Sequence, residues 1–224
     1  MYDKIKTEQI NRLRGLIGEK MSGFRLEHTL GVERMAVRLG ELMAPEHVDL
    51  LRAAALLHDV TKELTLPEQV EICERFGVTL TKEELAAPAT LHSITASLII
   101  PEQYPEFALE ELLAAVRYHT TGRESMSLCE KIIYLADYID ETRKYDDCIA
   151  LREEFFSAEP EKMTQKERLE HLDRVILHSF DLTVADLLEK GRVISPETVK
   201  ARNSVIFELA NMKNHNGGDK NGRD

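Results

Sequence analysis

The sequence predicts an all-α protein, a single bundle of roughly nine helices. Helix-start and helix-end signals recur along the whole chain, whereas the alternation of apolar and polar residues that marks strands is almost absent. The 224 residues are 43% hydrophobic and 31% charged, which is typical of a soluble globular domain long enough to bury a core.

The helix boundaries follow from local signals along the chain. Pro45 fits a first helical position, because apolar residues between 48 and 55 then recur at helical spacing. Capping boxes, in which Ser or Thr precedes Glu by three residues, begin at Thr81, Ser127 and Thr164. Gly77 and Gly191 follow helical patterns where a C-terminal cap is expected, and Ser195-Pro196 opens the final helix.

One main domain is expected over residues 22–212, because neither an internal repeat nor a low-complexity linker interrupts this stretch. Residues 1–21 are interpreted as an N-terminal helical extension. Residues 213–224 are rich in Asn, Gly, Asp and Lys, so they are expected to form a disordered polar tail.

Charge and targeting signals exclude several classes of function. The net charge of -11 disfavours nucleic acid as a partner, since binding to a phosphate backbone needs a basic face. No apolar run is long enough to span a bilayer, and the N-terminal stretch lacks the apolar core of a signal peptide. Three cysteines without a C-x-x-C pair suit a reducing compartment, so a cytoplasmic protein is expected.

Five residues of metal-ligand type stand in apolar helical sequence: His28, His58, His92, His119 and Asp137. A single histidine in such a place is usually a hydrogen-bonded core or surface residue. Five together are harder to explain in that way, because a buried carboxylate is costly unless it is paired or bound to a metal. Imidazoles and carboxylates that point inward from several helices predict a cation site inside the bundle.

The adjacent pair His58-Asp59 ends the apolar run of residues 53–57. Neighbouring helical residues point about 100° apart, so the two share one metal only at a helix end or a distorted turn. Alternatively, they face two adjacent ions that the carboxylate bridges. Lys62 lies one turn beyond Asp59, where an ammonium is a poor metal ligand and a good contact for phosphate.

The remaining histidines have simpler interpretations. His47 and His215 are expected to be solvated. His171 and His178 lie seven residues apart and face the same way, without an evident third ligand.

The order His28, His58-Asp59, Asp137 resembles the HD superfamily of metal-dependent phosphohydrolases, which has an all-helical fold. More narrowly, three stretches resemble its YqeK-type branch, the symmetrical dinucleoside tetraphosphate hydrolases. These are HDVTKEL, LLAAVRYHTTGRESMSLCEKIIYLADYIDETR and VISPETVKARN. The likeness spans about residues 22 to 207, so the expected main domain is an HD domain.

The resemblance implies roles for individual residues. The implied metal ligands are His28, His58, Asp59 and Asp137, with one or two iron ions, or manganese or cobalt in their place. The implied catalytic residues are Asp59, Lys62, His92 and His119. The implied nucleotide contacts are Arg25, Asp59, Val60, Thr61, Lys62, His92, His119, Thr120, Arg143, Ile194, Ser195, Pro196, Glu197, Thr198 and Val199.

The implied reaction is symmetrical cleavage of diadenosine tetraphosphate to two ADP. Metal ions that lower the pKa of a bound water to roughly 7, together with cationic contacts to phosphate, suit this chemistry. Two alternatives remain: another HD-class nucleotide phosphohydrolase and a non-catalytic HD signalling module. The expected partners are a dinucleoside polyphosphate and its ADP product, without nucleic acid or membrane, and a homodimer is left open.

Overall fold

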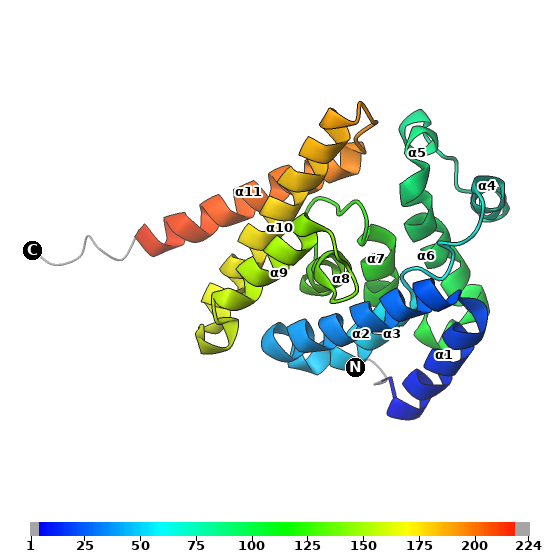
Figure 1. The fold of residues 1–224 in the computed structure, drawn as a ribbon, viewed down its shortest axis with the longest axis horizontal. Helices are drawn as coiled ribbons and strands as arrows, with labels where there is room; N and C mark the ends of the chain where they lie inside the picture. The colour runs from blue at the N-terminus through cyan, green and yellow to red at the C-terminus, as the bar shows by residue number, and fades with distance from the viewer. Residues whose placement is uncertain (1–4, 218–224) are drawn as a thin grey trace, which may run out of the picture.

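The computed structural model describes residues 5–217, with side chains to residue 212, and this part of the chain contains eleven α-helices and no strand. The helices are α1 (Thr7–Lys20), α2 (Gly23–Met43), α3 (Val48–Leu57), α4 (Leu66–Arg75), α5 (Lys82–Ala86), α6 (Leu91–Gln103), α7 (Glu110–Tyr118), α8 (Leu128–Ile139), α9 (Asp146–Ser157), α10 (Gln165–Glu189) and α11 (Pro196–Gly217). Figure 1 shows their arrangement.

The predicted all-α class is confirmed, and the estimate of roughly nine helices was low. Helices as short as α5, with five residues, are too brief for apolar periodicity to separate them from their neighbours. The capping boxes at Thr81, Ser127 and Thr164 form as expected, and Thr65 caps α4 in the same way. Within the described residues, none of the helices is long and apolar enough to cross a membrane.

Helix α3 is the centre of the core. Seven of its ten residues are buried, and α1, α2, α7 and α8 all pack against it. Three alanines at positions 53–55 and the absence of a side chain at Gly40 allow α2 and α3 to approach closely. Of the expected N-terminal extension, Thr7–Lys20 form α1, which buries Ile10, Leu13 and Ile17 in this same core, and residues 1–4 lie outside the described part of the chain.

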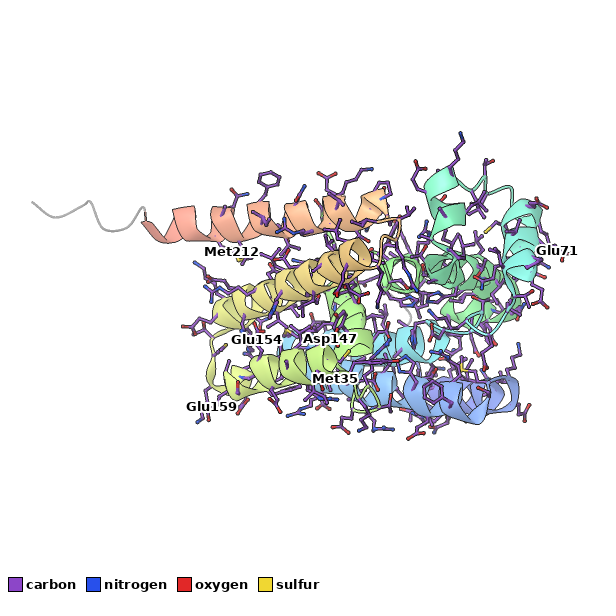
Figure 2. All side chains as sticks on the ribbon, turned by 45° about the horizontal axis from the view of Figure 1, so that its top comes forward. Met35, Glu71, Asp147, Glu154, Glu159 and Met212 are labelled. Atoms are coloured by element: carbon purple, nitrogen blue, oxygen red, sulfur yellow. The ribbon has the colours of Figure 1, made fainter. Side chains whose placement is uncertain are left out.

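The C-terminal helices form a separate edge of the molecule. Helices α9 and α10 pack side by side, and α11 packs along α10 and projects away from the core (Figure 1). In Figure 2, Met212 on α11 and Glu159 before α10 lie far from Glu71 on α4. Helix α11 runs to Gly217, so residues 213–217, expected in the tail, are helical, because extending an existing helix costs far less than nucleating one. The other tail residues, 218–224, lie outside the described part of the chain.

Gly122 connects this edge to the core. Its N–H donates to the Tyr118 carbonyl after α7, and its φ is +64°. A Cβ atom there would lie 2.7 Å from Phe180 Cζ and 2.8 Å from Ala201 Cβ. The turn that follows α7 therefore fits against α10 and α11 only because residue 122 is glycine.

We expect Gly122→Ala to lower the free energy of unfolding by about 2–5 kcal/mol, the sum of left-handed strain and overpacking. Gly77→Ala is the matched control, because Gly77 has φ +71° and open space around its Cα. The control should lose only about 1–2 kcal/mol. Urea denaturation of both variants measures the difference, and equal losses would show that the contact with α10 and α11 is unimportant.

Candidate metal centre

The five histidine and aspartate positions singled out in the sequence converge at one place. His28 comes from α2 and Asp137 from α8, whereas His58 and His119 are the residues directly after α3 and α7. His92 lies in the first turn of α6. The helices differ in direction, and their side chains meet because helix ends and helix faces point at the same small volume.

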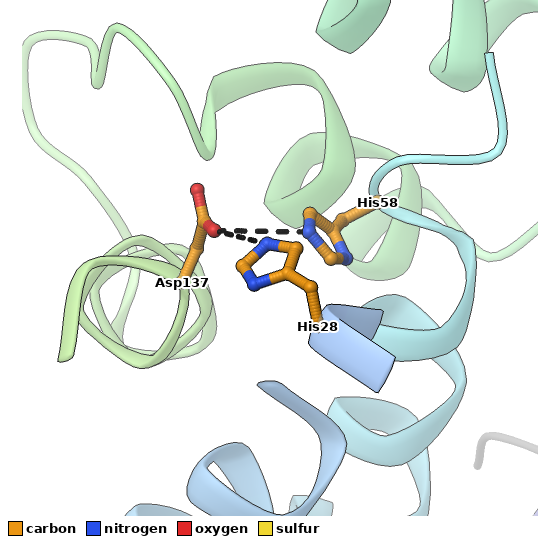
Figure 3. A group of neighbouring side chains, drawn as sticks. All are labelled: His28, His58 and Asp137. Atoms are coloured by element: carbon orange, nitrogen blue, oxygen red, sulfur yellow. Dashed lines mark ion pairs between the residues drawn. The ribbon is translucent and has the colours of Figure 1, made fainter. Parts of the chain in front are cut away.

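One group consists of His28, His58 and Asp137 (Figure 3). Asp137 Oδ1 lies 3.0 Å from His28 Nε2 and 3.8 Å from His58 Nε2. One ligand atom from each residue lies within 4.8 Å of the others, close enough for a single cation to contact all three.

Asp59 connects this group to a second one. Its Oδ2 faces the first group, 3.4 Å from His58 Nε2 and 3.7 Å from His28 Nε2. Its Oδ1 lies 3.2 Å from His92 Nε2 and 3.7 Å from His119 Nε2. The carboxylate therefore stands between two sets of imidazoles, which is the arrangement required if it bridges two ions.

Backbone carbonyls orient two of the imidazoles. His58 Nδ1 is 2.6 Å from the Ala55 carbonyl and His119 Nδ1 is 2.7 Å from the Val116 carbonyl, so each ring donates from Nδ1 and turns Nε2 inward. The Nε2 atom of His58 is buried without a hydrogen-bond partner. A buried nitrogen of this kind, facing carboxylates, has the donor chemistry of a transition-metal site.

The charges of the site agree with this interpretation. Burial alone would raise the pKa of Asp59, but the imidazoles of His58, His119 and His92 hold that pKa well below its usual value. Burial and the nearby His119 and Lys62 lower the pKa of His92 to about 4. Burial likewise lowers the pKa of His119. The lowered pKa values keep both rings neutral near pH 7, which is the form that binds a cation.

The centre opens into a cavity of about 720 Å³. Four residues expected to contact nucleotide line it: Lys62, His119, Thr120 and Arg143. Lys62 Nζ lies 3.1 Å from His92 Nδ1, and burial lowers the pKa of this ammonium. Arg143 donates to Asp137 Oδ1 at 2.5 Å, and Arg25 pairs with Asp59. Lys62 and Arg143 therefore place cations on the cavity wall beside the centre, whereas Arg25 pairs with Asp59 and does not line the cavity.

Other residues expected to contact nucleotide lie elsewhere. Thr61 is buried, and its hydroxyl donates to the His92 carbonyl at 2.9 Å, so it holds α6 in place. Val60 packs against the core. The segment Ile194 to Val199 forms the turn before α11 and the start of that helix, and it does not line the cavity. The wall on that side comes instead from the second half of α10 and from Tyr145.

Sequence reasoning missed Asp140. This carboxylate is fully buried, and its Oδ2 lies 3.2 Å from His28 Nδ1. Its Oδ1 accepts the Thr142 N–H at 2.8 Å. Gly31 leaves the space, since a Cβ there would lie 2.6 Å from Asp140 Oδ1. A carboxylate that holds the far nitrogen of a histidine orients the ring and makes it a better ligand. The motif YIDETR contains two adjacent acidic residues, and spacing alone does not show which of them turns inward.

The fold and the site define a class, a helical domain with a histidine- and aspartate-lined cation centre at the mouth of a cavity. Comparison with known proteins identifies the family within this class. The HD domain model matches residues 25–142, which is more than half of the chain. The chain belongs to the HD-domain family.

Three relatives are each named symmetrical bis(5'-nucleosyl)-tetraphosphatase. The protein from Halalkalibacterium halodurans is 28% identical over 86% of this chain and 95% of its own. The protein from Bacillus subtilis is 25% identical, over 85% of this chain and 94% of its own. The protein from Staphylococcus aureus is 27% identical, over 91% of this chain and 98% of its own. A crystal structure from Clostridium acetobutylicum, described as a predicted HD superfamily hydrolase involved in NAD metabolism, superposes with a TM-score of 0.76. It is 32% identical, covering 88% of this chain and 97% of that one.

We expect Gly31→Ala to weaken metal binding by about 10- to 100-fold, because the new methyl group displaces Asp140 from His28. Gly15→Ala is the control, since nothing lies within 4 Å of a Cβ at that position in α1. The control should gain up to about 1 kcal/mol of stability from its helix propensity and should bind metal normally. Titration of chelator-treated protein measures both affinities. Unchanged metal affinity in Gly31→Ala would show that Asp140 does not support His28 as a metal ligand.

Metal uptake should release a proton below pH 9. Burial lowers the pKa of His28, but the carboxylates of Asp137 and Asp140 outweigh it and raise that pKa to about 9. Protonated His28 therefore stabilises the metal-free fold below pH 6.5, and this contribution is lost as pH rises toward 9. Because a histidine must be neutral to bind a metal, the affinity for the metal should increase as pH rises over the same range. Calorimetry in buffers of different ionisation enthalpy counts the protons, and a pH-independent affinity would contradict the assignment of His28.

Proposed function

We propose that this protein is a metal-dependent hydrolase that cleaves dinucleoside tetraphosphates symmetrically, converting diadenosine tetraphosphate into two molecules of ADP. The observation that carries the proposal is the buried Asp59 carboxylate between two sets of imidazoles, with Lys62 and Arg143 beside it on the cavity wall. The names of the three relatives support this substrate, and the HD domain supports the class of reaction.

The donor set favours iron, with manganese or cobalt as substitutes. Half of the ligands His28, His58, Asp59 and Asp137 are imidazoles, whereas magnesium prefers oxygen donors throughout. His92 and His119 face the second oxygen of Asp59 and would complete a second position. When bound, such ions supply Lewis acidity toward phosphoryl oxygens and lower the pKa of a water molecule to roughly 7.

The residues of the chain would position the polyphosphate. Lys62 and Arg143 can neutralise phosphoryl oxygens, and the Thr120 hydroxyl, 3.2 Å from His92 Nε2, can donate to one. The Arg25 guanidinium lies on the Asp59 side. A clamp of this kind holds one nucleoside diphosphate half in register, so that only the phosphorus at its edge meets the metal centre. The cut then falls at the middle of a tetraphosphate.

The alternatives make different predictions for product composition. Another HD-class phosphohydrolase would act at a terminal phosphate or on a mononucleotide. A non-catalytic module would bind metal without turnover. NAD is the natural comparison substrate, because the solved relative is described as involved in NAD metabolism. The two nucleosides of NAD are joined by two phosphates.

We expect early product analysis of diadenosine tetraphosphate to give ADP alone, and diadenosine pentaphosphate to give ADP with ATP. Hydrolysis should require the metal and should be lost after chelation. NAD should be a poor substrate, because two phosphates do not extend past the clamp. AMP and ATP in equal amounts from the tetraphosphate would overturn the symmetrical cut while leaving the metal centre in place.

A further inference from the structure

A second group of metal-ligand type lies apart from Asp59. It consists of His47 in the 3₁₀ turn η1 (Pro45–His47), Glu111 in the first turn of α7 and Cys129 in the first turn of α8. One ligand atom from each lies within 4.8 Å of the others, and His47 Nε2 is 3.8 Å from Glu111 Oε2. His47, expected to be solvated, is half-buried here.

The group occupies the opposite ends of the helices that carry the metal centre. Glu111 and Cys129 lie eight residues before His119 and Asp137 on α7 and α8, about 12 Å along each axis. The turn η1 joins α2, which carries His28, to α3, which His58 directly follows. Neither His47, Glu111 nor Cys129 lines the cavity described above. The two groups are therefore separate sites that share the same helices.

Burial and charge suit a cation that solvent can reach. Cys129 is 1% exposed, whereas the side chains of Glu111 and His47 are 24% and 35% exposed, so the group opens on one side. Burial, followed by the carboxylates of Glu111, Glu46 and Glu130, raises the pKa of the Cys129 thiol. The negative potential that disfavours a thiolate favours a divalent ion, and a bound ion in turn stabilises the thiolate.

We propose that His47, Glu111 and Cys129 bind a divalent ion of the zinc type, with a water molecule as the fourth ligand. A thiolate, an imidazole and a carboxylate form a donor set that suits Zn²⁺ and not magnesium or calcium. On binding, the thiol gives its proton to solvent and His47 coordinates as the neutral ring. Ligand atoms of a tetrahedral zinc site lie roughly 3.3–3.7 Å apart, so small side-chain movements close the group around the ion.

Such an ion would connect η1, α7 and α8 at the end of the bundle away from the substrate. Because these elements carry or precede ligands of the catalytic centre, the bound ion should raise the melting temperature without entering the reaction. The proposal goes beyond the hydrolase function and does not depend on the substrate.

Cobalt(II) provides the test, because the catalytic centre contains no sulfur donor among its histidines and aspartates. Titrating Co²⁺ into the protein as purified should produce a thiolate-to-cobalt charge-transfer band in the ultraviolet, with one equivalent at saturation. Zn²⁺ should displace the bound Co²⁺, so that the band disappears. Cys129→Ala should abolish the band. Cys148→Ala is the matched control and should keep it, since Cys148 borders the catalytic cavity.

His47→Asn covers the case in which Cys129→Ala does not fold, because it alters only the exposed side of the group. His47→Asn should keep the band and weaken Co²⁺ affinity by at least about tenfold. Removing a residue that only hydrogen-bonds to a metal ligand already costs about that much, and His47 is proposed as a ligand itself. Absence of the band in the parent protein would overturn the proposal. So would its persistence in Cys129→Ala, or identical titrations of His47→Asn and the parent.

Discussion

The structure depends on the burial of one carboxylate. Asp59 is 3% exposed and follows the last turn of α3, a helix with seven of its ten residues buried. An ionised carboxylate in such a place costs several kcal/mol unless partners offset the cost. The four imidazoles of His28, His58, His92 and His119 face its two oxygens in pairs, with Arg25 beside them. A divalent cation between these groups would offset the charge further.

The helices are arranged so that these partners can reach Asp59. Helix α3 packs closely against α2 through its alanines and through Gly40, which brings His28 next to the end of α3. Helix α7 ends at the same point, and α8 crosses beside both with Asp137. Gly31 and Gly122 leave space for Asp140 and for the C-terminal helices. Apolar packing therefore determines where the polar groups meet, and the chemistry occurs at the edge of the core.

Much of this could be predicted from the sequence, because the signals are local. Capping residues mark helix starts, and the expected capping boxes form. Polar ligand-type residues in apolar helices come together, and their role as a metal centre stays a prediction. Contacts between distant segments could not be predicted. The wall formed by α10 and Tyr145, the pairing of Asp140 with His28, and the group around Cys129 all depend on how helices pack. Neither hydrophobic periodicity nor residue spacing encodes those distances. The placement of Ile194 to Val199 near the nucleotide stays a prediction.

The most direct test compares the metal content and the melting temperature of the parent protein and Asp59→Asn, a substitution that keeps the size of the side chain and removes its charge. If the carboxylate is a metal ligand, elemental analysis should find iron, manganese or cobalt in the parent and little of these metals in Asp59→Asn, with helical content retained. Chelation should lower the melting temperature of the parent by more than that of the variant, which keeps only the separate group around Cys129. Equal metal content in both proteins, or no transition metal in either, would contradict the account.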